Sequence, residues 1–357
     1  MSEQGRDPLP VSQASLERRD FLKLGAATVG GAAAGASLAS TATLAAERPL
    51  PLNPRTPLAM PTRNLGRTGY AVGVFSLGGQ AAVEQPNNEA AAVAIVEKAL
   101  DLGVNYIDTA ARYGGDTPWS QTYIGQVMKR RRAEAFLATK THDRTRDGSL
   151  KLLEQSLKLL QTDHLDLWQI HNLRSLEEVE QIFRPEGAVK ALQEAKEQGI
   201  VRHIGVTGHA DPAVLIEALD RARFDTILLA LNAADPHHLS FQQKLLPLAV
   251  EKEMGIIGMK IPARGRILAG FTPPPEGSPQ RRLQDKGPGT LRMEEALRYV
   301  LSLPVSTVII GCDSATQLEE NIRLARGFNP LSGAQMASLE EKAKPVHQQA
   351  LFFRRWA

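Results

Sequence analysis

The amino-acid sequence predicts a (β/α)8 barrel of the TIM type, with a β-hairpin in front of its first strand. From residue 62 onward, short apolar runs alternate with amphipathic helical stretches, a pattern typical of buried parallel strands joined by helices. Eight such units follow one another over roughly 250 residues, the usual size of this barrel. The competing fold, a doubly wound sheet, carries a Gly-x-Gly-x-x-Gly turn after its first strand. Residues 78–85 (GGQAAVEQ) lack that spacing, and the barrel is therefore favoured.

Each predicted element rests on its own local pattern. Gly66 and Gly69 predict the turn of a hairpin over residues 63–72. The stretch 88–103 places its apolar residues on one helical face and ends at a glycine, and 149–161 carries a similar apolar stripe. The eight strand candidates span residues 72–79, 104–110, 135–140, 164–171, 201–209, 225–232, 255–261 and 305–312.

The first 46 residues predict an export signal. The basic stretch 17-ERRDFLK-23 precedes an uncharged segment that is rich in Ala, Gly, Ser and Thr and ends in small residues. Arg18 and Arg19, with the residues after them, resemble the twin-arginine motif. We therefore expect export to the periplasm by the twin-arginine translocation (Tat) machinery, with cleavage after Ala45 or Ala46. The alternative is a membrane anchor formed by the uncleaved signal, although so many small polar residues make a weakly hydrophobic span.

The chain after this signal divides into three parts. Residues 47–61 are rich in proline and predict an extended linker. Residues 62–327 form the predicted barrel. Residues 328–357 form a C-terminal tail, which we expect to pack against the barrel exterior. No stable membrane span is expected once the signal is removed.

Composition narrows the function classes. The chain of 357 residues has a net charge of +3, too small to indicate a nucleic-acid-binding protein. Its densest basic run, 129-KRRR-132, closes a predicted helix, where the helix dipole favours cations. Cys312 is the only cysteine, which excludes an internal disulfide and a cysteine-ligated cluster. His237 and His238 are adjacent instead of lying at helix-face spacing, so no metal site is expected.

Three of the predicted strands end in an ionisable side chain. Asp108, Lys140 and His171 stand at the ends of the second, third and fourth strand candidates, and Tyr113 follows in the loop after Asp108. In a parallel α/β fold the carboxyl ends of the strands face a shared crevice, so we expect these four side chains to gather there. An acid, an amine, an imidazole and a phenol in one crevice predict an acid/base enzyme.

These four groups fit the reduction of a carbonyl group. A tyrosine hydroxyl has a reference pKa of about 10, and a nearby Lys140 ammonium would lower that pKa for Tyr113. Asp108 would keep Lys140 charged and in place, and a neutral His171 could hydrogen-bond the same substrate oxygen. Tyr113 could then protonate the oxygen of a small carbonyl substrate while a hydride reaches its carbon. Because no side chain supplies a hydride, a nicotinamide cofactor is required.

At this point the chain resembles the aldo-keto reductases over residues 62–326. The matching pieces stand in the family's order at residues 63–79, 103–114, 137–140, 165–171, 199–207 and 309–321. The resemblance implies that Asp108, Tyr113, Lys140 and His171 are the catalytic residues, with Tyr113 as the general acid. It also implies NADP(H) bound in an extended form, with its adenosine-phosphate contacts on residues 311–321. The best candidates there are Gly311, Ser314, Gln317, Glu320 and Asn321.

The sequence departs from the family pattern around the cofactor. Many members follow strand five with Ser-Asn, which binds the nicotinamide carboxamide, whereas here Thr207 would act alone or with Asn232. Lys260 stands where an aromatic residue usually stacks on the nicotinamide, although some branches of the family carry Met-Lys there. Gln317 stands where a basic residue often binds the 2′-phosphate. NAD(H) therefore stays possible beside NADP(H).

Two other functions stay open at the level of the sequence. A Schiff-base aldolase would use Lys140 as its nucleophile, but that requires an unprotonated lysine, and Asp108 would keep it charged. A regulatory or sensor protein would bind the nicotinamide cofactor with little turnover. Substrate choice is expected to reside in the βα loops, chiefly the long loop 263–289. The arginines of this loop, which would either close over cofactor phosphates or face solvent, are Arg264, Arg266, Arg281 and Arg282.

Overall fold

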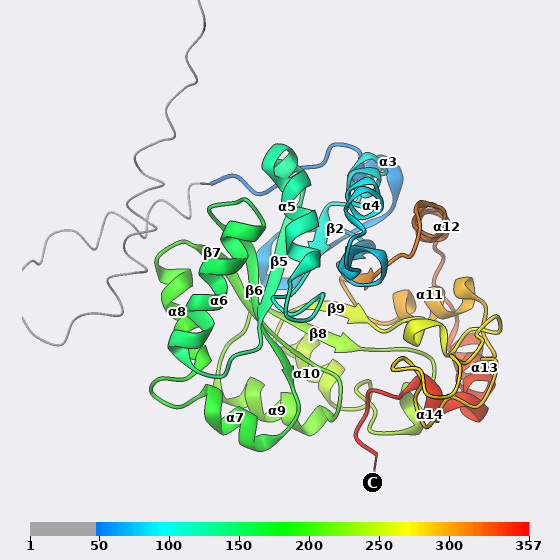
Figure 1. Ribbon diagram of the computed structural model, residues 1–357. Coiled ribbons are helices and arrows are strands. Elements are labelled where there is room, and N and C mark those ends of the chain that lie inside the picture. The colour runs from blue at the N-terminus through cyan, green and yellow to red at the C-terminus, as the bar shows by residue number, and fades with distance from the viewer. Residues whose placement is uncertain (1–47, 357) are drawn as a thin grey trace, which may run out of the picture.

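The computed structural model describes residues 48–356 and shows a closed barrel of eight parallel strands surrounded by helices (Figure 1). The strands are β3 (Phe75–Gly78), β4 (Tyr106–Asp108), β5 (Phe136–Thr141), β6 (Leu165–Leu173), β7 (Val201–Gly208), β8 (Thr226–Ala230), β9 (Gly255–Met259) and β10 (Thr307–Ile310). β10 pairs with β3 and closes the barrel. Each strand lies within or close to a stretch that the sequence predicted, and the fold class is confirmed. Every residue of β8 is buried, which explains why this strand is almost entirely apolar; β5 is also fully buried, although it ends in the polar residues Thr139, Lys140 and Thr141.

Helices follow the strands and cover the outside of the barrel (Figure 1). They are α4 (Glu89–Asp101), α5 (Trp119–Arg131), α6 (Arg146–Leu159), α7 (Leu176–Ile182), α8 (Ala188–Glu197), α9 (Pro212–Arg221), α10 (Leu245–Glu251), α11 (Met293–Ser302) and α12 (Ala315–Arg326). Their starts follow ordinary capping chemistry. At α6 the Thr145 hydroxyl accepts a hydrogen bond from the Gly148 N–H at 3.1 Å, and at α9 Asp211 caps a first turn that begins with proline. The predicted helices over 88–103 and 149–161 correspond to α4 and α6.

A hairpin closes the amino-terminal end of the barrel, which we call the base. Its strands β1 (Thr62–Asn64) and β2 (Ala71–Gly73) are antiparallel and are joined by a 3-10 turn, η1 (Gly66–Thr68). Leu65 and Tyr70 belong to the apolar cluster that fills the barrel interior, and the Tyr70 hydroxyl donates to the Asn105 carbonyl at 2.8 Å. Gly66 has a φ of 53° and lies against the backbone at Gly255, so a larger residue would not fit there. The predicted hairpin is therefore present, and it plugs one end of the barrel.

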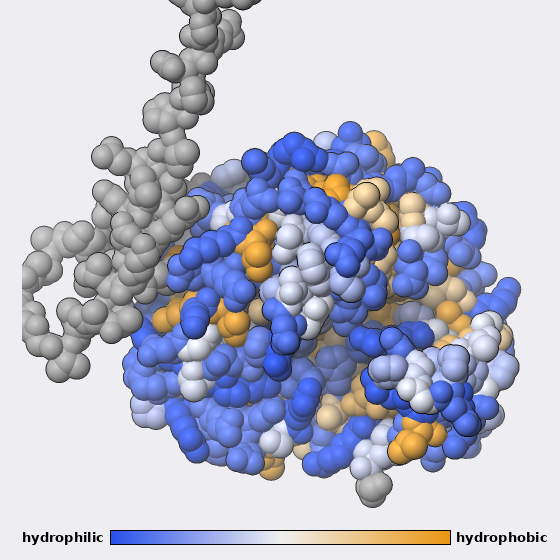
Figure 2. Space-filling view, in the orientation of Figure 1, coloured by the Kyte–Doolittle hydropathy of each residue, from blue (hydrophilic) through white to orange (hydrophobic). Residues whose placement is uncertain are grey.

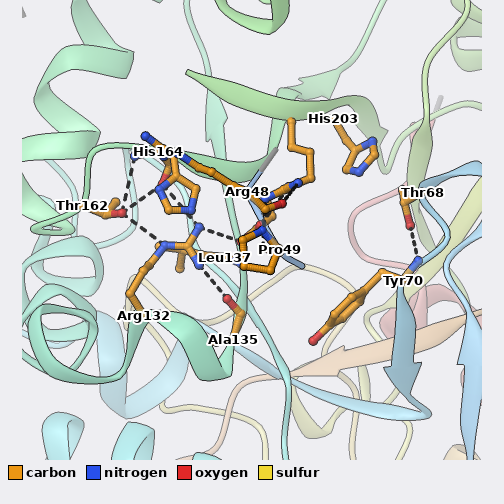
Figure 3. A network of polar contacts seen from close by, with 12 residues as sticks. Arg48, Pro49, Thr68, Tyr70, Arg132, Ala135, Leu137, Thr162, His164 and His203 are labelled. Carbon is orange, nitrogen blue, oxygen red and sulfur yellow. Dashed lines mark hydrogen bonds and ion pairs between the residues drawn. The ribbon is translucent and has the colours of Figure 1, made fainter. Parts of the chain in front are cut away.

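The base also contains a buried cluster of charged side chains and one backbone donor, which we call the base network. It consists of Arg132, Asp166, Arg202 and the backbone N–H of Leu137, and Figure 3 shows part of it. Asp166 is fully buried at the start of β6 and accepts a hydrogen bond from Arg132 Nη2 at 2.6 Å and from the Leu137 N–H at 2.9 Å. Arg202 Nε lies 3.5 Å from the second oxygen of the same carboxylate. One buried carboxylate is thus surrounded by two guanidinium groups and a backbone donor.

The segment expected to be an extended linker packs against this base. Arg202 donates to the backbone carbonyls of Arg48 at 2.9 Å and Pro49 at 3.3 Å. Further along, the buried Asn53 side chain donates to the Leu100 carbonyl at 2.8 Å, and a short helix α3 (Thr56–Ala59) follows. Proline content predicted an extended backbone, but it could not show that the barrel offers partners for the carbonyls of this backbone. The predicted export signal lies outside the described residues.

The C-terminal tail begins outside the barrel and ends over its opening. Helix α13 (Gly333–Ala343) packs beside α11, as expected, and the tail continues through η6 (Lys344–Val346) and α14 (His347–Ala350) (Figure 1). The last residues then cross the carboxyl end of the barrel, which we call the mouth. There Arg354 donates to the Ala230 carbonyl at 3.0 Å and pairs with the buried Asp235. The expectation of an exterior tail is therefore wrong for this final segment, because a buried ion pair fixes it at the mouth.

Three further observations concern the described part of the chain. Residues 129–131 close α5, and Arg130 and Arg131 there form ion pairs with neighbouring carboxylates. No helix within residues 48–356 is long and apolar enough to cross a membrane. Over the same residues, no three His, Cys, Asp or Glu side chains are grouped so as to hold a metal ion.

Candidate active site

The four predicted catalytic side chains lie together at the mouth. Asp108 ends β4, Lys140 lies near the end of β5 and His171 lies near the end of β6, which are three adjacent strands. Tyr113 comes from the loop after β4, and its hydroxyl lies 3.4 Å from Lys140 Nζ. The structure therefore brings together all four residues, as predicted from three strand ends and the loop that follows one of them.

Lys140 is held by Asp108 in a fully buried ion pair. Its Nζ also donates to the Thr109 carbonyl at 2.8 Å, and Gln169 Nε2 donates to the second oxygen of Asp108 at 3.3 Å. Burial alone would lower the pKa of Lys140, but Asp108 and Tyr113 together outweigh it, so the pKa of Lys140 is raised. Lys140 is therefore a charged ammonium. This state opposes the Schiff-base aldolase, which needs a neutral amine.

Tyr113 is a protonated phenol in this environment. Burial raises the pKa of Tyr113, and the Lys140 ammonium lowers it by a smaller amount, so the net direction is upward. The lowering expected from Lys140 is present but is outweighed by burial. Lys140 Nζ also lies 4.9 Å from the centre of the Tyr113 ring. The hydroxyl thus carries a proton and has a cation next to it, as a general acid requires.

His171 completes the group as a neutral imidazole. Its ring meets the Tyr113 ring edge to face, with 5.8 Å between the ring centres. Burial, and then the neighbouring Lys140 ammonium, hold the pKa of His171 well below its usual range. A neutral imidazole can donate a hydrogen bond to a substrate oxygen without adding another charge to the pocket.

An open cavity of about 590 Å³ extends from this group along the mouth. Asp108 and Tyr113 line its inner end, and residues of α12 line the other end. The β9–α11 loop (residues 260–292) forms one wall together with Phe352 of the tail. Figure 2 shows the molecule hollowed between the barrel and the lobe formed by this loop and the C-terminal helices. The cavity therefore connects the predicted catalytic residues with the predicted cofactor residues of α12.

The sequence profile of the aldo/keto reductase family matches residues 71–344. The chain belongs to the aldo/keto reductase family. It is 26% identical over 300 residues to an uncharacterised oxidoreductase, YqkF, of Bacillus subtilis, covering 74% of this chain and 91% of that one. It is 28% identical to L-galactose dehydrogenase of Arabidopsis thaliana, covering 80% and 94% of the two chains. The holo form of an aldo-keto reductase from Bacillus halodurans superposes with a TM-score of 0.64 at 25% identity, over 80% of this chain and 97% of that one. The protein is thus an oxidoreductase of this family.

Five of the predicted cofactor residues of this aldo/keto reductase line the cavity. They are Lys260, Gly311, Gln317, Glu320 and Asn321. Lys260 lies toward the catalytic group, and the other four lie at the end formed by α12. The helix α12 presents its amino terminus on this side, where backbone N–H groups favour an anion.

The other three predicted cofactor residues do not line the cavity. The Thr207 hydroxyl accepts a hydrogen bond from the Asn172 N–H at 2.7 Å. The Asn232 side chain donates to the carbonyls of Lys260 at 3.3 Å and Ala350 at 3.2 Å, so it ties the β9 loop to the tail. Ser314 caps α12 by accepting from a backbone N–H of the first turn. In this structure each of these polar groups already has a protein partner, which spacing along the chain could not reveal.

The structure adds cavity residues that the sequence alone did not single out. Gln80 and Phe352 line the cavity, the first just after β3 and the second near the end of the chain. Of the four loop arginines, Arg264 and Arg282 line the cavity as well. Arg266 lines it too, but its guanidinium is paired with the buried Asp285 at 2.6 Å, and Arg281 donates to a backbone carbonyl. The sequence offered one sign of Gln80: it follows a pair of glycines, Gly78 and Gly79, at the end of the first strand.

The lining of the cavity fits a phosphate-bearing dinucleotide. Lys260, Arg264 and Arg282 supply positive charge along its length, and α12 supplies backbone donors at its far end. The inner end carries the proton donor and the neutral imidazole. The lining also contains the carboxylates Glu84, Asp313 and Glu320, so the positive charge is local and not uniform. A channel with cationic side chains that leads to an acid/base group suits a cofactor with one reactive end and one anionic end.

Proposed function

We propose that the protein is an NADP(H)-dependent reductase that converts an aldehyde or ketone into an alcohol. The observation that carries the proposal is the Tyr113 hydroxyl, which lies at the inner end of the cavity and 3.4 Å from Lys140 Nζ. A protonated phenol beside a fixed ammonium suits the transfer of a proton to an oxygen. Membership in the aldo/keto reductase family supports the same class of reaction.

The four side chains have distinct roles in this proposal. When bound, the reduced nicotinamide supplies a hydride for the carbonyl carbon. Tyr113 gives its phenolic proton to the carbonyl oxygen, so that hydride and proton together make the alcohol. Lys140, held by Asp108, stabilises the phenolate that remains on Tyr113. His171 hydrogen-bonds the carbonyl oxygen and fixes its position before the transfer.

The test is the carbonyl-dependent oxidation of NADPH by the wild-type protein and by Tyr113→Phe. We expect the Phe variant to bind NADPH with unchanged affinity and to lose about 10²–10⁴-fold in turnover, the usual contribution of a general acid. An active Phe variant would show that another group donates the proton. A wild-type protein that binds NADPH but turns over no aldehyde or ketone would instead be the regulatory or sensor protein considered above.

We also propose that the protein is exported to the periplasm by the twin-arginine machinery. The motif around Arg18 and Arg19, followed by an uncharged segment that ends in small residues, supports this. Replacing Arg18 and Arg19 together by lysine should leave the precursor in the cytoplasm. Undiminished export of that variant would indicate another kind of signal, and a full-length chain in the membrane fraction would indicate the uncleaved anchor.

A further inference from the structure

Lys260 is a half-buried amine in the cavity that the proposed reaction does not use. It follows β9 and lies where the cavity approaches Asp108 and Tyr113. Its Nζ donates to Gln80 Oε1 at 3.3 Å. Among residues 48–356 no carboxylate lies within 4.0 Å of this Nζ, in contrast to Lys140, which has Asp108. The ammonium therefore has hydrogen-bonding and charge capacity left for something else in the cavity.

The backbone holds Lys260 in this place at a conformational cost. Its φ is 63°, in the left-handed region that side chains other than glycine rarely adopt. The Lys260 carbonyl accepts hydrogen bonds from the Ala263 N–H at 3.0 Å and from Asn232 Nδ2 at 3.3 Å, which fixes the turn. Strain of this kind persists where the surrounding structure imposes it, often at a functional site.

Burial and the neighbouring charges lower the pKa of Lys260, so its ammonium loses a proton more easily than an ordinary lysine does. Burial, and then the neighbouring Arg264, lower the pKa of Lys260 to about 8. Glu84 and Asp108 act in the opposite direction, and Lys140 adds to the lowering. Near neutral pH the side chain is therefore mostly an ammonium, yet it can lose its proton at a modest cost.

The reactive end of the cofactor must lie at this part of the cavity. In the proposed function a hydride reaches a carbonyl carbon whose oxygen faces Tyr113, and the anionic end of the cofactor lies toward α12. Lys260 lines the cavity between these two places. The nicotinamide ring is uncharged when reduced and carries a positive charge when oxidised. A cation beside it therefore distinguishes the two forms by like-charge repulsion.

We propose that Lys260 selects the redox state of the cofactor, disfavouring the cationic oxidised ring and so favouring the binding of NADPH over that of NADP⁺. This inference rests on the proposed function. Its consequence is that oxidised cofactor leaves readily and competes weakly with the reduced form. The reduced and oxidised rings need not fit the cavity differently, because the difference in their charge is enough for the selection.

The selection has a defined pH dependence. The oxidised ring can be accepted once Lys260 gives up its proton, so NADP⁺ affinity should rise about tenfold per pH unit up to the pKa of about 8 and then level off. NADPH affinity should lack this slope. At about pH 7 the protonation of Lys260 should therefore weaken NADP⁺ binding by about tenfold, and at about pH 6 by up to about a hundredfold.

Four other titratable groups near Lys260 have pKa values shifted away from this interval. Lys140 and Tyr113 have raised pKa values, and His171 and His209 have pKa values well below the usual range for histidine. The carboxylate of Asp108 is paired with Lys140. The remaining charged neighbours are Glu84 and Arg264. The 2′-phosphate is common to both cofactor forms, so its ionisation cancels in the ratio of their dissociation constants.

The experiment measures dissociation constants for NADPH, by its fluorescence, and for NADP⁺, by displacement of NADPH, from about pH 6 to about pH 9. Lys260→Met removes the charge at similar volume, and Lys260→Arg keeps a charge that does not titrate here. In the wild type the ratio of the NADP⁺ and NADPH constants should be large at low pH and fall as pH rises. The Met variant should show a small ratio at every pH, and the Arg variant a large ratio at every pH.

Each outcome has one meaning. If the wild type and the Met variant show the same ratio at every pH, Lys260 does not select the redox state. If the Met variant loses both cofactor forms equally while remaining folded by circular dichroism, Lys260 is a general binding residue and the inference is also wrong. If the wild type binds neither cofactor form, it is the proposed function that fails.

Discussion

The mouth and the base of this barrel each contain a buried carboxylate paired with a cation, and the two pairs differ in their surroundings. At the base, Asp166 is enclosed by Arg132, Arg202 and a backbone N–H. At the mouth, Asp108 holds Lys140, whose Nζ lies 3.4 Å from the Tyr113 hydroxyl at the edge of an open cavity. Arginine keeps its charge at any physiological pH, whereas lysine, tyrosine and histidine can exchange protons.

This difference separates stability from chemistry within one fold. The base network joins the starts of β5, β6 and β7, and through Arg202 it holds the segment at Arg48. The mouth group faces a space that another molecule can enter. Burial of a charged pair is therefore no indication of function by itself. What marks the mouth is the titratable neighbour that remains accessible to a substrate.

The largest effect is expected from removing the charged pair at the mouth. The double variant Asp108→Asn with Lys140→Met should lower carbonyl reduction by about 10³-fold or more, because Tyr113 loses its neighbouring cation. Its unfolding free energy should stay within about 2 kcal/mol of the wild type, since replacing both partners of a buried pair leaves no unpaired charge. Steady-state kinetics and urea unfolding measure the two quantities. A strongly unstable double variant would show that the mouth pair holds the fold as well.

The reverse pattern is expected at the base. Asp166→Asn should cost about 3–5 kcal/mol of unfolding free energy, because Arg132 and Arg202 lose a buried partner. The turnover of the folded variant should be unchanged, since the base lies at the far end of the barrel. Asp163→Asn, on the same face but half exposed, is the matched control and should cost far less. A large loss of turnover in folded Asp166→Asn protein would contradict this separation of roles.

A smaller effect is expected at the outer end of the mouth cavity. Gln317 lines the cavity and accepts a hydrogen bond from the Asp313 N–H at 2.8 Å, but it carries no charge. We therefore expect a modest preference for NADPH over NADH. Gln317→Arg should increase this preference by about one to two orders of magnitude, because a charge-assisted contact contributes about 1.5–3 kcal/mol. Gln335→Arg, at the equivalent capping position of α13, is the control. A wild-type preference for NADH would argue against a 2′-phosphate site on α12.

The smallest effect is expected where the base meets solvent. Arg48 pairs with Asp163 at 2.9 Å, and both side chains are partly exposed, so Arg48→Ala should cost at most about 1 kcal/mol. His164, and then Arg48, hold the pKa of Asp163 below its ordinary value. The stabilisation is therefore present above the unfolded-state pKa and lost as pH falls through the lowered one. Urea unfolding at neutral and acidic pH measures this, and a loss well above 1 kcal/mol would mean that the pair is shielded from water.

The sequence contained enough information for the barrel because its strands are buried on both sides. Such strands are predominantly apolar runs, and β8 is an example in which every residue is buried. The catalytic group was predictable for a related reason. Asp108, Lys140 and His171 each interrupt or end such a run, and parallel strands bring these positions to one face.

Contacts between distant segments were not predictable in this way. The side-chain amide of Asn232 donates its hydrogen bonds to the carbonyls of Lys260 and Ala350. Its position after a strand gave no sign of these partners. The docking of residues 48–61 and the crossing of the mouth by Arg354 depend on single side chains far away in the sequence. Local periodicity reports which face of an element is apolar, but it does not report which backbone carbonyls are left for a remote donor.

The two ends of the described chain leave the barrel at opposite faces, which bears on how the protein is handled. Arg48 lies at the base, while Trp356 stacks on His238 at the mouth with 3.9 Å between ring centres (Figure 1). An affinity tag or a bead attached after Trp356 would sit beside the opening and extend the segment that crosses it. Attachment ahead of Arg48, in place of the predicted signal, leaves the opening turned away from the support. For immobilisation, the protein should therefore be attached through its amino-terminal end.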